Sequence, residues 1–310
     1  MNFVKVVDLH CDVLMKMFQN HTISFIDSDL LAVNYKHLRK TNSKLQFFAL
    51  YVPEQVHPML RYEAVLQMIQ LFYKKILTLP KMKHIQTKAD YIALKADEIG
   101  AVLALEGCDA VQDDFTRLAT LKELGVSSVG LTWNFSNIFA DGAMEKRNAG
   151  LSLKGRQLVK WLKKHAITLD VSHLSEASFW DSISICGKVF ASHSNCRAVC
   201  DHPRNLNDEQ IIALINRRGL IGLTFVPHFV TTGHSATITH LLNHIEHICE
   251  LGGSEYIGFG SDFDGTPQYV QGLDSYADYH TLQEELLKHY TYGQVEGFLQ
   301  KNYEKFLFDD

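Results

Sequence analysis

Eight short runs of apolar, β-branched and aromatic residues recur along the chain and predict buried strands. Within each run the apolar character is continuous rather than alternating, which is typical of parallel strands covered on both faces. The runs are Phe3–Leu9, Leu45–Val52, Ala101–Leu105, Ser127–Leu131, Ile167–Val171, Lys188–Ala191, Leu220–Phe225 and Tyr256–Gly260.

Most of the gaps between these runs carry helical patterns. Apolar residues recur there at spacings of three and four, as they do on one face of a helix. Asn207 followed by Gln210 is a capping-box pattern, and Ser175 before Glu176 marks another helix start. The predicted helices are Ala64–Leu77, Phe115–Leu124, Leu151–Lys164, Asp208–Asn216 and Ile238–Leu251.

This alternation of strand and helix predicts an α/β fold, a (β/α)8 TIM-type barrel, as a single domain over residues 1–310. The alternative is a doubly wound open sheet, but no GxGxxG motif follows the first run and no division into two halves is visible. Extra helices are expected over the barrel mouth within 13–44 and at the C-terminus within Tyr276–Asp310. The C-terminal helices would pack on the barrel or on a second subunit, so a homodimer is among the expected arrangements.

Composition and charge narrow the class of protein. Of the 310 residues, 46% are hydrophobic, and the net charge of −5 gives no electrostatic reason to bind nucleic acid or an anionic membrane. No stretch reaches the ~18 apolar residues that a membrane helix needs, and Lys5 and Asp8 interrupt the N-terminus before a signal-peptide core. We therefore expect a cytoplasmic protein without a nucleic-acid or membrane partner. The six cysteines are expected to be reduced and mostly buried.

Ionisable residues follow five of the eight predicted strands. In a barrel the C-terminal ends of the strands converge on one face, where active sites lie. The alternation of a strand also places His10 and Asp12 on the same side. The residues are His10, Asp12, Glu106, Asp170, His173, His193, Asp262 and Asp264.

Burial of so many ionisable groups together is costly unless a cation compensates them, and imidazole with carboxylate suits zinc or a similar transition metal. Five ligands exceed what one tetrahedral zinc with an open position takes, which favours two metal ions with Glu106 as the bridge. His10 and Asp12 would complete one metal, and His173 and His193 the other. Two such ions share a water, lower its pKa and polarise a carbonyl or phosphoryl oxygen.

A second group of histidines lies on the predicted helix Ile238–Leu251. His240, His244 and His247 have helical spacing, and they fall opposite the apolar stripe of that helix. We expect all three to be solvated and not to bind metal.

The strand-end residues resemble the membrane (renal) dipeptidase family of metallopeptidases, within the amidohydrolase-type barrels. The match runs through the chain in the family's order. The matching segments are Asp8-Leu-His-Cys-Asp12, Leu105-Glu-Gly107, Leu131-Thr-Trp-Asn134, Asp170-Val-Ser-His173, Ser192-His-Ser194, His202-Pro-Arg-Asn205 and Gly258-Phe-Gly-Ser-Asp-Phe-Asp-Gly265.

This resemblance implies two zinc ions per chain, other divalent transition metals being alternatives, and hydrolysis of small dipeptides, with tolerance of D-residues at the C-terminal position. The family's metal ligands fall on the same five residues. Its catalytic aspartate falls on Asp262, and its arginine for the substrate carboxylate falls on Arg204. Glu106, as the bridging ligand, is counted with the catalytic residues.

The chain also departs from the animal members of the family. Trp133 stands where they have a substrate-contacting histidine, and a tyrosine of theirs is missing near Phe225 and Val226. The Leu131-Thr-Trp-Asn134 form resembles the bacterial branch of the family, and we expect neither the signal peptide nor the lipid anchor of the animal enzymes. These differences affect the specificity pocket rather than the metal site.

The hypothesis that follows is attack of a metal-bridging hydroxide on the scissile carbonyl, with Asp262 carrying the proton to the leaving amine. Arg204 would grip the terminal carboxylate of the substrate with its planar fork.

Some neighbours of these residues have less defined expectations. Trp133 and Phe139 would line the pocket or pack in the core, and Asn134 and Asn137 are candidate substrate contacts. Asp264 is expected to be a structural acid of its turn. Asp170 is a candidate partner for a ligand histidine.

Other functions stay open on the sequence alone. Another hydrolase of the same barrel type would use the same metal site: an N-acyl amino acid hydrolase, a lactonase or a phosphodiesterase. A non-catalytic metal-binding barrel is a third class, and the loss of Asp262 or of a ligand would be its signature.

Overall fold

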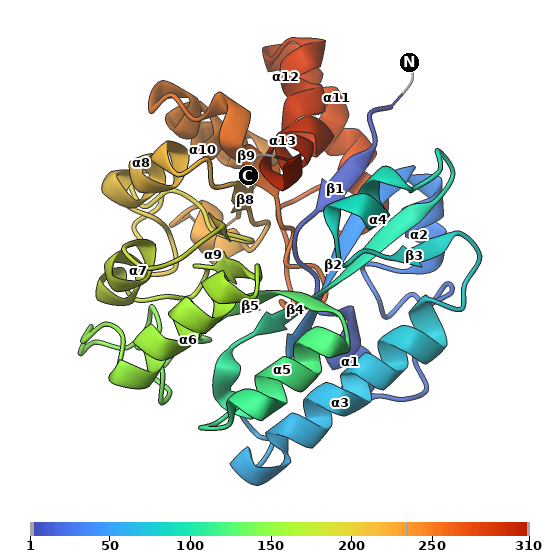
Figure 1. Ribbon diagram of the computed structural model, residues 1–310. Coiled ribbons are helices and arrows are strands. Elements are labelled where there is room, and N and C mark those ends of the chain that lie inside the picture. Colours follow the sequence, from blue (N-terminus) through green and yellow to red (C-terminus); the bar gives the residue numbers. More distant parts are fainter. Residues whose placement is uncertain (1–2, 234, 309–310) are drawn as a thin grey trace.

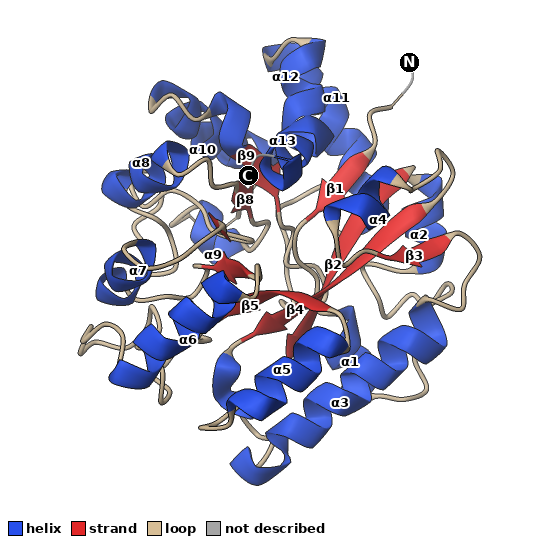
Figure 2. Cartoon of the chain, in the orientation of Figure 1, coloured by secondary structure: helices blue, strands red, loops and turns tan. Residues whose placement is uncertain are grey.

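The structure is a computed structural model that describes residues 3–233 and 235–308. Eight parallel strands form a ring in the order β7-β6-β5-β4-β2-β1-β9-β8, with helices around it (Figures 1 and 2). The predicted (β/α)8 barrel is therefore confirmed. The strands of the described chain are β1 (Val6–Asp8), β2 (Ser43–Tyr51), β3 (Met82–His84), β4 (Ile99–Glu106), β5 (Val126–Gly130), β6 (Thr168–Asp170), β7 (Val189–Phe190), β8 (Ile221–Leu223) and β9 (Ile257–Phe259).

The ring closes between β7 and β8 through a single bridge. Ala191 pairs with Ile221, and the amide of Ala191 donates to the carbonyl of Leu220 at 2.9 Å. The short β3 lies outside the ring and pairs with the first residues of β4. The sequence pattern missed β3 because three residues are too few to show a periodicity.

Helices follow most of the strands and cover the outside of the barrel (Figure 2). All five predicted helices are present, and the first of them begins at Arg61 and continues into a π-helical turn. The α-helices are α1 (Val13–Gln19), α2 (Tyr35–Lys40), α3 (Arg61–Leu71), α4 (Lys88–Ile92), α5 (Phe115–Glu123), α6 (Leu153–Lys164), α7 (Glu176–Ile183), α8 (Asp208–Asn216), α9 (Pro227–Val230), α10 (Ile238–Glu250), α11 (Tyr279–His289), α12 (Tyr292–Glu296) and α13 (Asn302–Phe308). Short 3-10 turns lie at Pro58–Leu60, Cys108–Ala110, Ser254–Tyr256 and Tyr276–Asp278, and π-helical turns at Phe72–Ile76 and Gly297–Lys301.

Local sequence explains where several of these helices begin. Asn207 accepts from the Gln210 amide at 2.9 Å, and Gln210 accepts from the Asn207 amide in return, which is the predicted capping box. Ser175 caps α7, as expected. The long first connection holds α1 and α2, as predicted.

The C-terminal helix α13 closes the barrel interior at the end opposite the strand ends that carry the predicted ligands. Phe306 stacks on Phe190 of β7 with ring centroids 5.8 Å apart, and Tyr303 meets Phe47 of β2 edge-on at 5.8 Å. In Figure 1 this helix lies between β1 and β9, at the upper side of the ring. The C-terminal stretch is thus helical and packs on the barrel, and residues 309–310 lie outside the described residues.

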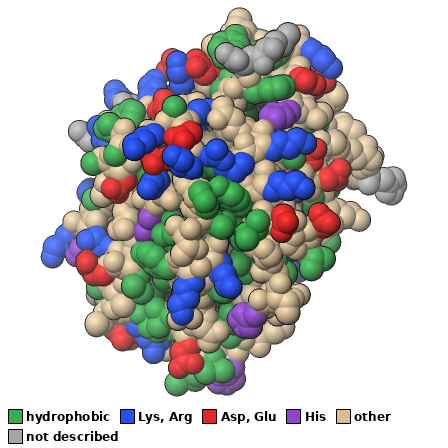
Figure 3. All heavy atoms as spheres, turned by 90° about the vertical axis from the view of Figure 1, so that its right-hand side faces the viewer, with side chains coloured by type: hydrophobic (Ala, Val, Ile, Leu, Met, Phe, Trp, Pro, Cys, Tyr) green, Lys and Arg blue, Asp and Glu red, His purple; other side chains and the backbone are tan. Residues whose placement is uncertain are grey.

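The outer surface of the described chain mixes both signs of charge. On the face drawn in Figure 3, Lys and Arg side chains gather toward the upper half with acidic side chains between them. No helix among the described residues is both long enough and apolar enough to span a membrane.

Candidate active site and metal centre

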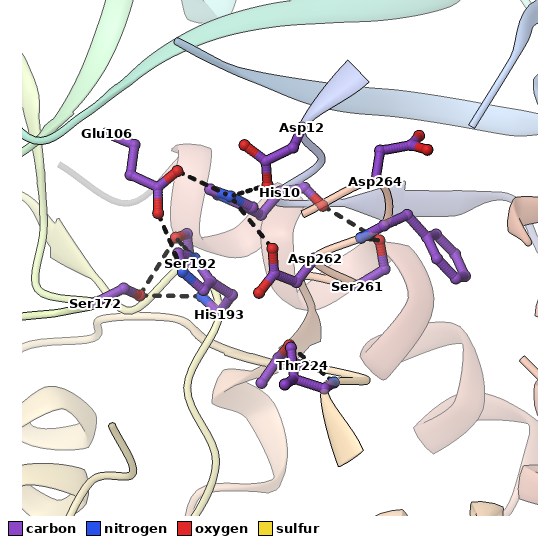
Figure 4. A network of polar contacts seen from close by, with 12 residues as sticks. His10, Asp12, Glu106, Ser172, Ser192, His193, Thr224, Ser261, Asp262 and Asp264 are labelled. Atoms are coloured by element: carbon purple, nitrogen blue, oxygen red, sulfur yellow. Dashed lines mark hydrogen bonds and ion pairs between the residues drawn. The ribbon is translucent and has the colours of Figure 1, made fainter. Parts of the chain in front are cut away.

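The structure brings the five predicted metal ligands together at the C-terminal ends of the strands. His10 and Asp12 follow β1, Glu106 ends β4, and His173 and His193 follow β6 and β7. The four residues other than Glu106 are buried, and the Glu106 side chain exposes 9% of its surface. Figure 4 shows several of these side chains pointing toward one another.

Glu106 lies between two groups of ligand atoms. Its Oε2 is 3.4 Å from His10 Nε2, which in turn is 3.4 Å from Asp12 Oδ2. Its Oε1 is 2.9 Å from His173 Nε2 and 3.6 Å from His193 Nε2. One carboxylate oxygen therefore serves each group, which is the arrangement of a bridging carboxylate.

The backbone around Glu106 needs a glycine. Gly107 has φ +81°, and an added Cβ would come within 3.3 Å of the Trp133 amide nitrogen. The chain turns there from β4 toward the loop after β5.

His173 and His193 present their Nε2 atoms to one place. These two atoms are 2.8 Å apart. The Asn134 Oδ1 lies 2.9 Å from His173 Nδ1 and can only accept, so His173 carries its proton on Nδ1. His193 Nδ1 is 2.7 Å from the Ser192 hydroxyl. The two Nε2 atoms thus converge beside Glu106 Oε1.

The donor set fits divalent cations. His10 Nε2 and Asp12 Oδ1 are buried and have no hydrogen-bond partner among the described residues. The Nε2 atoms of His173 and His193 are 2.8 Å apart, close enough to bind one cation together. Neutral imidazoles with carboxylates are the ligands that zinc takes.

Asp262 lies at the edge of this cluster. Its Oδ1 is 3.8 Å from His10 Nε2, and a ring nitrogen of His10 and one carboxylate oxygen each of Asp12 and Asp262 lie within 4.8 Å of one another as a further set of three ligand atoms. The sequence had placed Asp262 only as a proton carrier. Its backbone is left-handed, with φ 61°, as is that of His173 with φ 67°. Left-handed non-glycine residues cluster at functional sites.

Burial and neighbouring charges separate the pKa values of the two carboxyl groups that face His10. Burial disfavours ionisation of Glu106, but the imidazoles of His10 and His173 hold the pKa of Glu106 well below its usual range. For Asp262, burial raises the pKa well above its usual range, and Asp12 and Glu106 add to this against the opposing effect of His10. Two carboxyl groups with opposite shifts are typical of a catalytic site.

The two clustered histidines are shifted toward the neutral form. Burial and then the charge of Arg204 lower the pKa of His173 to about 3. Burial, with His10 and His173 nearby, lowers the pKa of His193 well below its usual range. Neutral imidazole is the form that binds metal.

Arg204 is buried on the wall of the same site, in the loop after β7. Its Nη2 donates to the His193 carbonyl at 3.2 Å, and its guanidinium carbon lies 5.5 Å from the ring centroid of Phe229. Burial lowers the pKa of Arg204 to about 10, although Asp262 and Glu106 oppose the shift. Its Nε is buried with no partner among the described residues, which leaves donor capacity for a ligand.

Trp133 lies beside the cluster, half-buried. Its ring centroid is 6.1 Å from that of His173 and 5.2 Å from that of Tyr51. Tyr51 ends β2 and was missed from the sequence, because no ionisable residue marks that strand end. Phe139 is fully buried and packs on Phe115, so of the two expected roles it has the one in the core.

Hydrogen bonds show what three further polar residues near the site contact. Asp264 is a structural acid, as expected, since it accepts from Lys16 and from the amides of Ala32 and Val33. Asn137 donates to the Leu131 carbonyl at 2.7 Å and holds its own loop. Asp170 reaches a ligand histidine only through the Ser192 hydroxyl.

The prediction that all three histidines of α10 are solvated is wrong for His244. That side chain is fully buried, its Nδ1 accepts from the Cys196 amide at 3.1 Å, and its Nε2 donates to the Val230 carbonyl at 2.9 Å. The helix buries a wider face than its apolar stripe, because the loops after β7 and β8 also pack on it. His247 stays near the surface, with its Nε2 2.7 Å from Asp208.

A parallel (β/α)8 barrel with histidines and carboxylates clustered at its C-terminal face is the arrangement of metal-dependent hydrolases. The chain belongs to the membrane dipeptidase family, peptidase family M19, whose model matches residues 1–307. This is a family of metallopeptidases, and the resemblance noted from the sequence is confirmed.

Individual relatives agree with this assignment. The chain is 31% identical over 235 residues to an uncharacterized dipeptidase of Schizosaccharomyces pombe, a match that covers 71% of this chain and 56% of the yeast protein. It is 26% identical over 310 residues to dipeptidase 3 of Mus musculus, a match that covers 96% of this chain and 62% of the mouse protein. The chain thus spans 56% to 62% of the length of these two relatives.

Solved structures show the same fold along almost the full chain. A dipeptidase AC, a metallopeptidase of family M19, has a TM-score of 0.92 at 25% identity and covers 99% of this chain and 98% of its own. A metallopeptidase from Rhodobacter sphaeroides, liganded with a phosphinate mimic of the dipeptide L-Ala-D-Ala, has a TM-score of 0.92 at 24% identity, with 99% of each chain covered.

Proposed function

We propose that this chain is a dipeptidase that binds two zinc ions and hydrolyses the peptide bond of small dipeptides, including those with a D-residue at the C-terminal position. The observation that carries the proposal is the division of the Glu106 carboxylate between two groups of ligand atoms. Family membership supports the same reaction.

The residues that would hold the cations follow from the two groups. His10, Asp12 and Glu106 Oε2 would hold one, and Glu106 Oε1 with His173 and His193 would hold the other. When bound there, two divalent cations lower the pKa of a water between them and polarise the scissile carbonyl.

Asp262 would move the proton. Its carboxyl group lies next to His10 and Asp12 and keeps 16% of its side-chain surface exposed, so it faces the space that substrate would enter. A carboxylate at this place can take a proton from a water and pass it on, as a general base does. Asp262 would accept the proton of the attacking water and give it to the nitrogen of the leaving amine.

Arg204 would bind the carboxylate of the C-terminal residue. A buried guanidinium with a free Nε–H holds a carboxylate with parallel hydrogen bonds. Arg204 Nη2 donates to the carbonyl of His193 at 3.2 Å, so a carboxylate bound by Arg204 would lie beside the metal centre. A longer peptide has no carboxylate at that place, so the substrate is a dipeptide. Trp133 and Tyr51 would form the apolar wall beside it.

The first experiment is amino-acid release from L-Ala-L-Ala, L-Ala-D-Ala and their C-terminal amides, by zinc-loaded and by chelated protein. The proposal expects release from the free acids by the zinc-loaded protein only, with two zinc ions per chain by elemental analysis. Release that survives full removal of metal would contradict it. If the protein binds two zinc ions but does not hydrolyse dipeptides, the dipeptidase assignment is wrong. N-acyl amino acids, lactones and phosphodiesters are then the substrates to test.

A further inference from the structure

Ser192 joins a buried carboxylate to the imidazole of His193. The Ser192 hydroxyl donates to Asp170 Oδ2 and lies 2.7 Å from His193 Nδ1. A hydroxyl has one proton, and because Ser192 donates it to Asp170, the same oxygen accepts from His193 Nδ1–H. His193 Nε2 then carries only its lone pair.

Two backbone amides fix which oxygen of the Asp170 carboxylate faces Ser192. The Oδ1 of Asp170 accepts from the amides of Ser172 and Ser192, each at 3.0 Å. Both contacts are with backbone donors, so their direction is fixed. Oδ2 is therefore the atom that faces the Ser192 hydroxyl.

The backbone of this segment is also fixed. The His193 amide donates to the Ser172 hydroxyl at 3.0 Å, a contact visible in Figure 4. An added Cβ at Gly222 or Gly260 would come within 2.0 Å or 1.9 Å of the Ser192 carbonyl oxygen, so neighbouring strands lie directly against it. The Ser192 hydroxyl also lies 3.3 Å from the Ser172 hydroxyl, which itself accepts from the His193 amide.

We propose that Asp170, acting through the Ser192 hydroxyl, is a positioning residue that holds His193 in the tautomer with its proton on Nδ1. This leaves Nε2 free to bind the second cation, so the inference rests on the metal centre of the proposed function. His173 differs, because its Nδ1–H donates directly to the neutral amide of Asn134. The two histidines of one metal group are thus oriented by different means.

The substitution Asp170→Asn reverses the direction of this chain of hydrogen bonds. The two backbone amides keep the oxygen of the new carboxamide on their side, so its NH2 group faces Ser192. The Ser192 hydroxyl then accepts from that NH2 group and donates to His193 Nδ1, which places the imidazole proton on Nε2. An isosteric change that leaves the shape of the site intact would thus block a metal ligand. Ser192→Ala removes the hydroxyl and leaves the tautomer free.

The experiment measures cation stoichiometry and affinity in the wild type, Asp170→Asn, Ser192→Ala and the double variant, by zinc competition titration and by the absorption of the cobalt-loaded proteins. Asp170→Asn should weaken the second cation about 10- to 100-fold, and Ser192→Ala should weaken it less. The double variant should return to the level of Ser192→Ala, because no hydroxyl remains to donate. Asp181→Asn, a similar change at an acid that accepts from Leu151 and Arg156, is the matched control and should bind two cations.

Each result has a defined meaning. Asp170→Asn with wild-type affinity, or a double variant weaker than Ser192→Ala, would overturn the role of Asp170. If a thermal unfolding experiment shows that Asp170→Asn is not folded, the test rests on Ser192→Ala. An unchanged affinity of Ser192→Ala for the second cation would then overturn the inference. A wild type that binds no metal would overturn the proposed function as well, which separates the two failures.

Discussion

The ammonium group of Lys16 lies 2.9 Å from Oδ1 of Asp264, and this contact joins α1 to the turn after β9. Asp264 also accepts from the amides of Ala32 and Val33 at 2.9 and 3.0 Å. The first and last strand ends of the barrel are thereby held together beside Asp12 and Asp262.

Asp264→Ala should lower the free energy of unfolding by about 3–5 kcal/mol, because it leaves a lysine and two amides without their acceptor. Lys16→Met should cost less, about 1 kcal/mol, since Lys16 is 31% exposed and water replaces part of the contact. Urea unfolding of both variants provides the measurement. Equal losses in the two variants would contradict the view that the carboxylate is the centre of this contact.

Asp262→Asn should keep both cations and lower kcat at least ~100-fold, because an amide cannot carry the proton between water and the leaving amine. Metal content by elemental analysis and kcat on L-Ala-L-Ala test the two parts separately. Activity near that of the wild type would exclude the proton-transfer role. Loss of a cation would instead assign Asp262 as a ligand, as its place beside His10 and Asp12 allows.

Arg204→Lys should raise KM for dipeptides about 10-fold or more and change kcat less, because lysine keeps the charge but loses the planar fork that binds a carboxylate with two hydrogen bonds. The control is Arg197→Lys, since Arg197 in the same loop pairs with Glu176 at 3.5 Å. If both variants raise KM equally, the effect belongs to the loop rather than to Arg204.

The barrel and the clustering of the five candidate ligands were predictable because both depend on local sequence. Continuous apolar runs mark buried parallel strands, and the polar residue after each run must lie on one face of a closed barrel. Glu106 could be chosen as the bridge from its place on the third of the eight runs, and the structure places its two oxygens between the two groups.

Contacts between distant segments could not be predicted in this way. His244 looked solvated on a helical projection, but loops from two other strand ends bury it. The role of Ser192 depends on Asp170, which lies 22 residues earlier in the chain. Tyr51 reaches the site from a strand end that carries no His, Asp or Glu. A search for these residues after each apolar run therefore does not find it.

Gly265→Ala should disrupt the metal centre without a change in any ligand. An added Cβ would lie 2.3 Å from Asp12 Oδ2 and 2.4 Å from Asp262 Oδ1, so both carboxylates must move. We expect weaker cation binding, measured by competition titration, and a lower kcat. Gly293→Ala is the matched control, because no atom lies within 4 Å of an added Cβ there. Equal cation affinity in the two variants would show that the carboxylates tolerate the displacement.

His244 should make stability depend on pH between about 4 and ~6.5. Burial lowers its pKa to about 4, and the positive fields of His247 and His240 act in the same direction. The unfolded chain therefore takes up a proton at His244 below pH ~6.5, whereas the folded protein takes it up only near pH 4. The contribution of neutral His244 to the free energy of unfolding is thus complete above pH ~6.5 and is lost as the pH falls through this window.

The physical reason is geometric as well as electrostatic, since Nδ1 accepts from the Cys196 amide and protonation there removes that hydrogen bond. His244→Gln has no such titration. The stability difference between the wild type and His244→Gln should shrink by about 3 kcal/mol from pH 7 to pH 4, measured by urea unfolding at each pH. His21→Gln, at an exposed histidine, is the matched control for the same side-chain replacement. A difference for His244→Gln that stays constant across this range would mean that the folded protein accepts the proton at His244 as readily as the unfolded chain does.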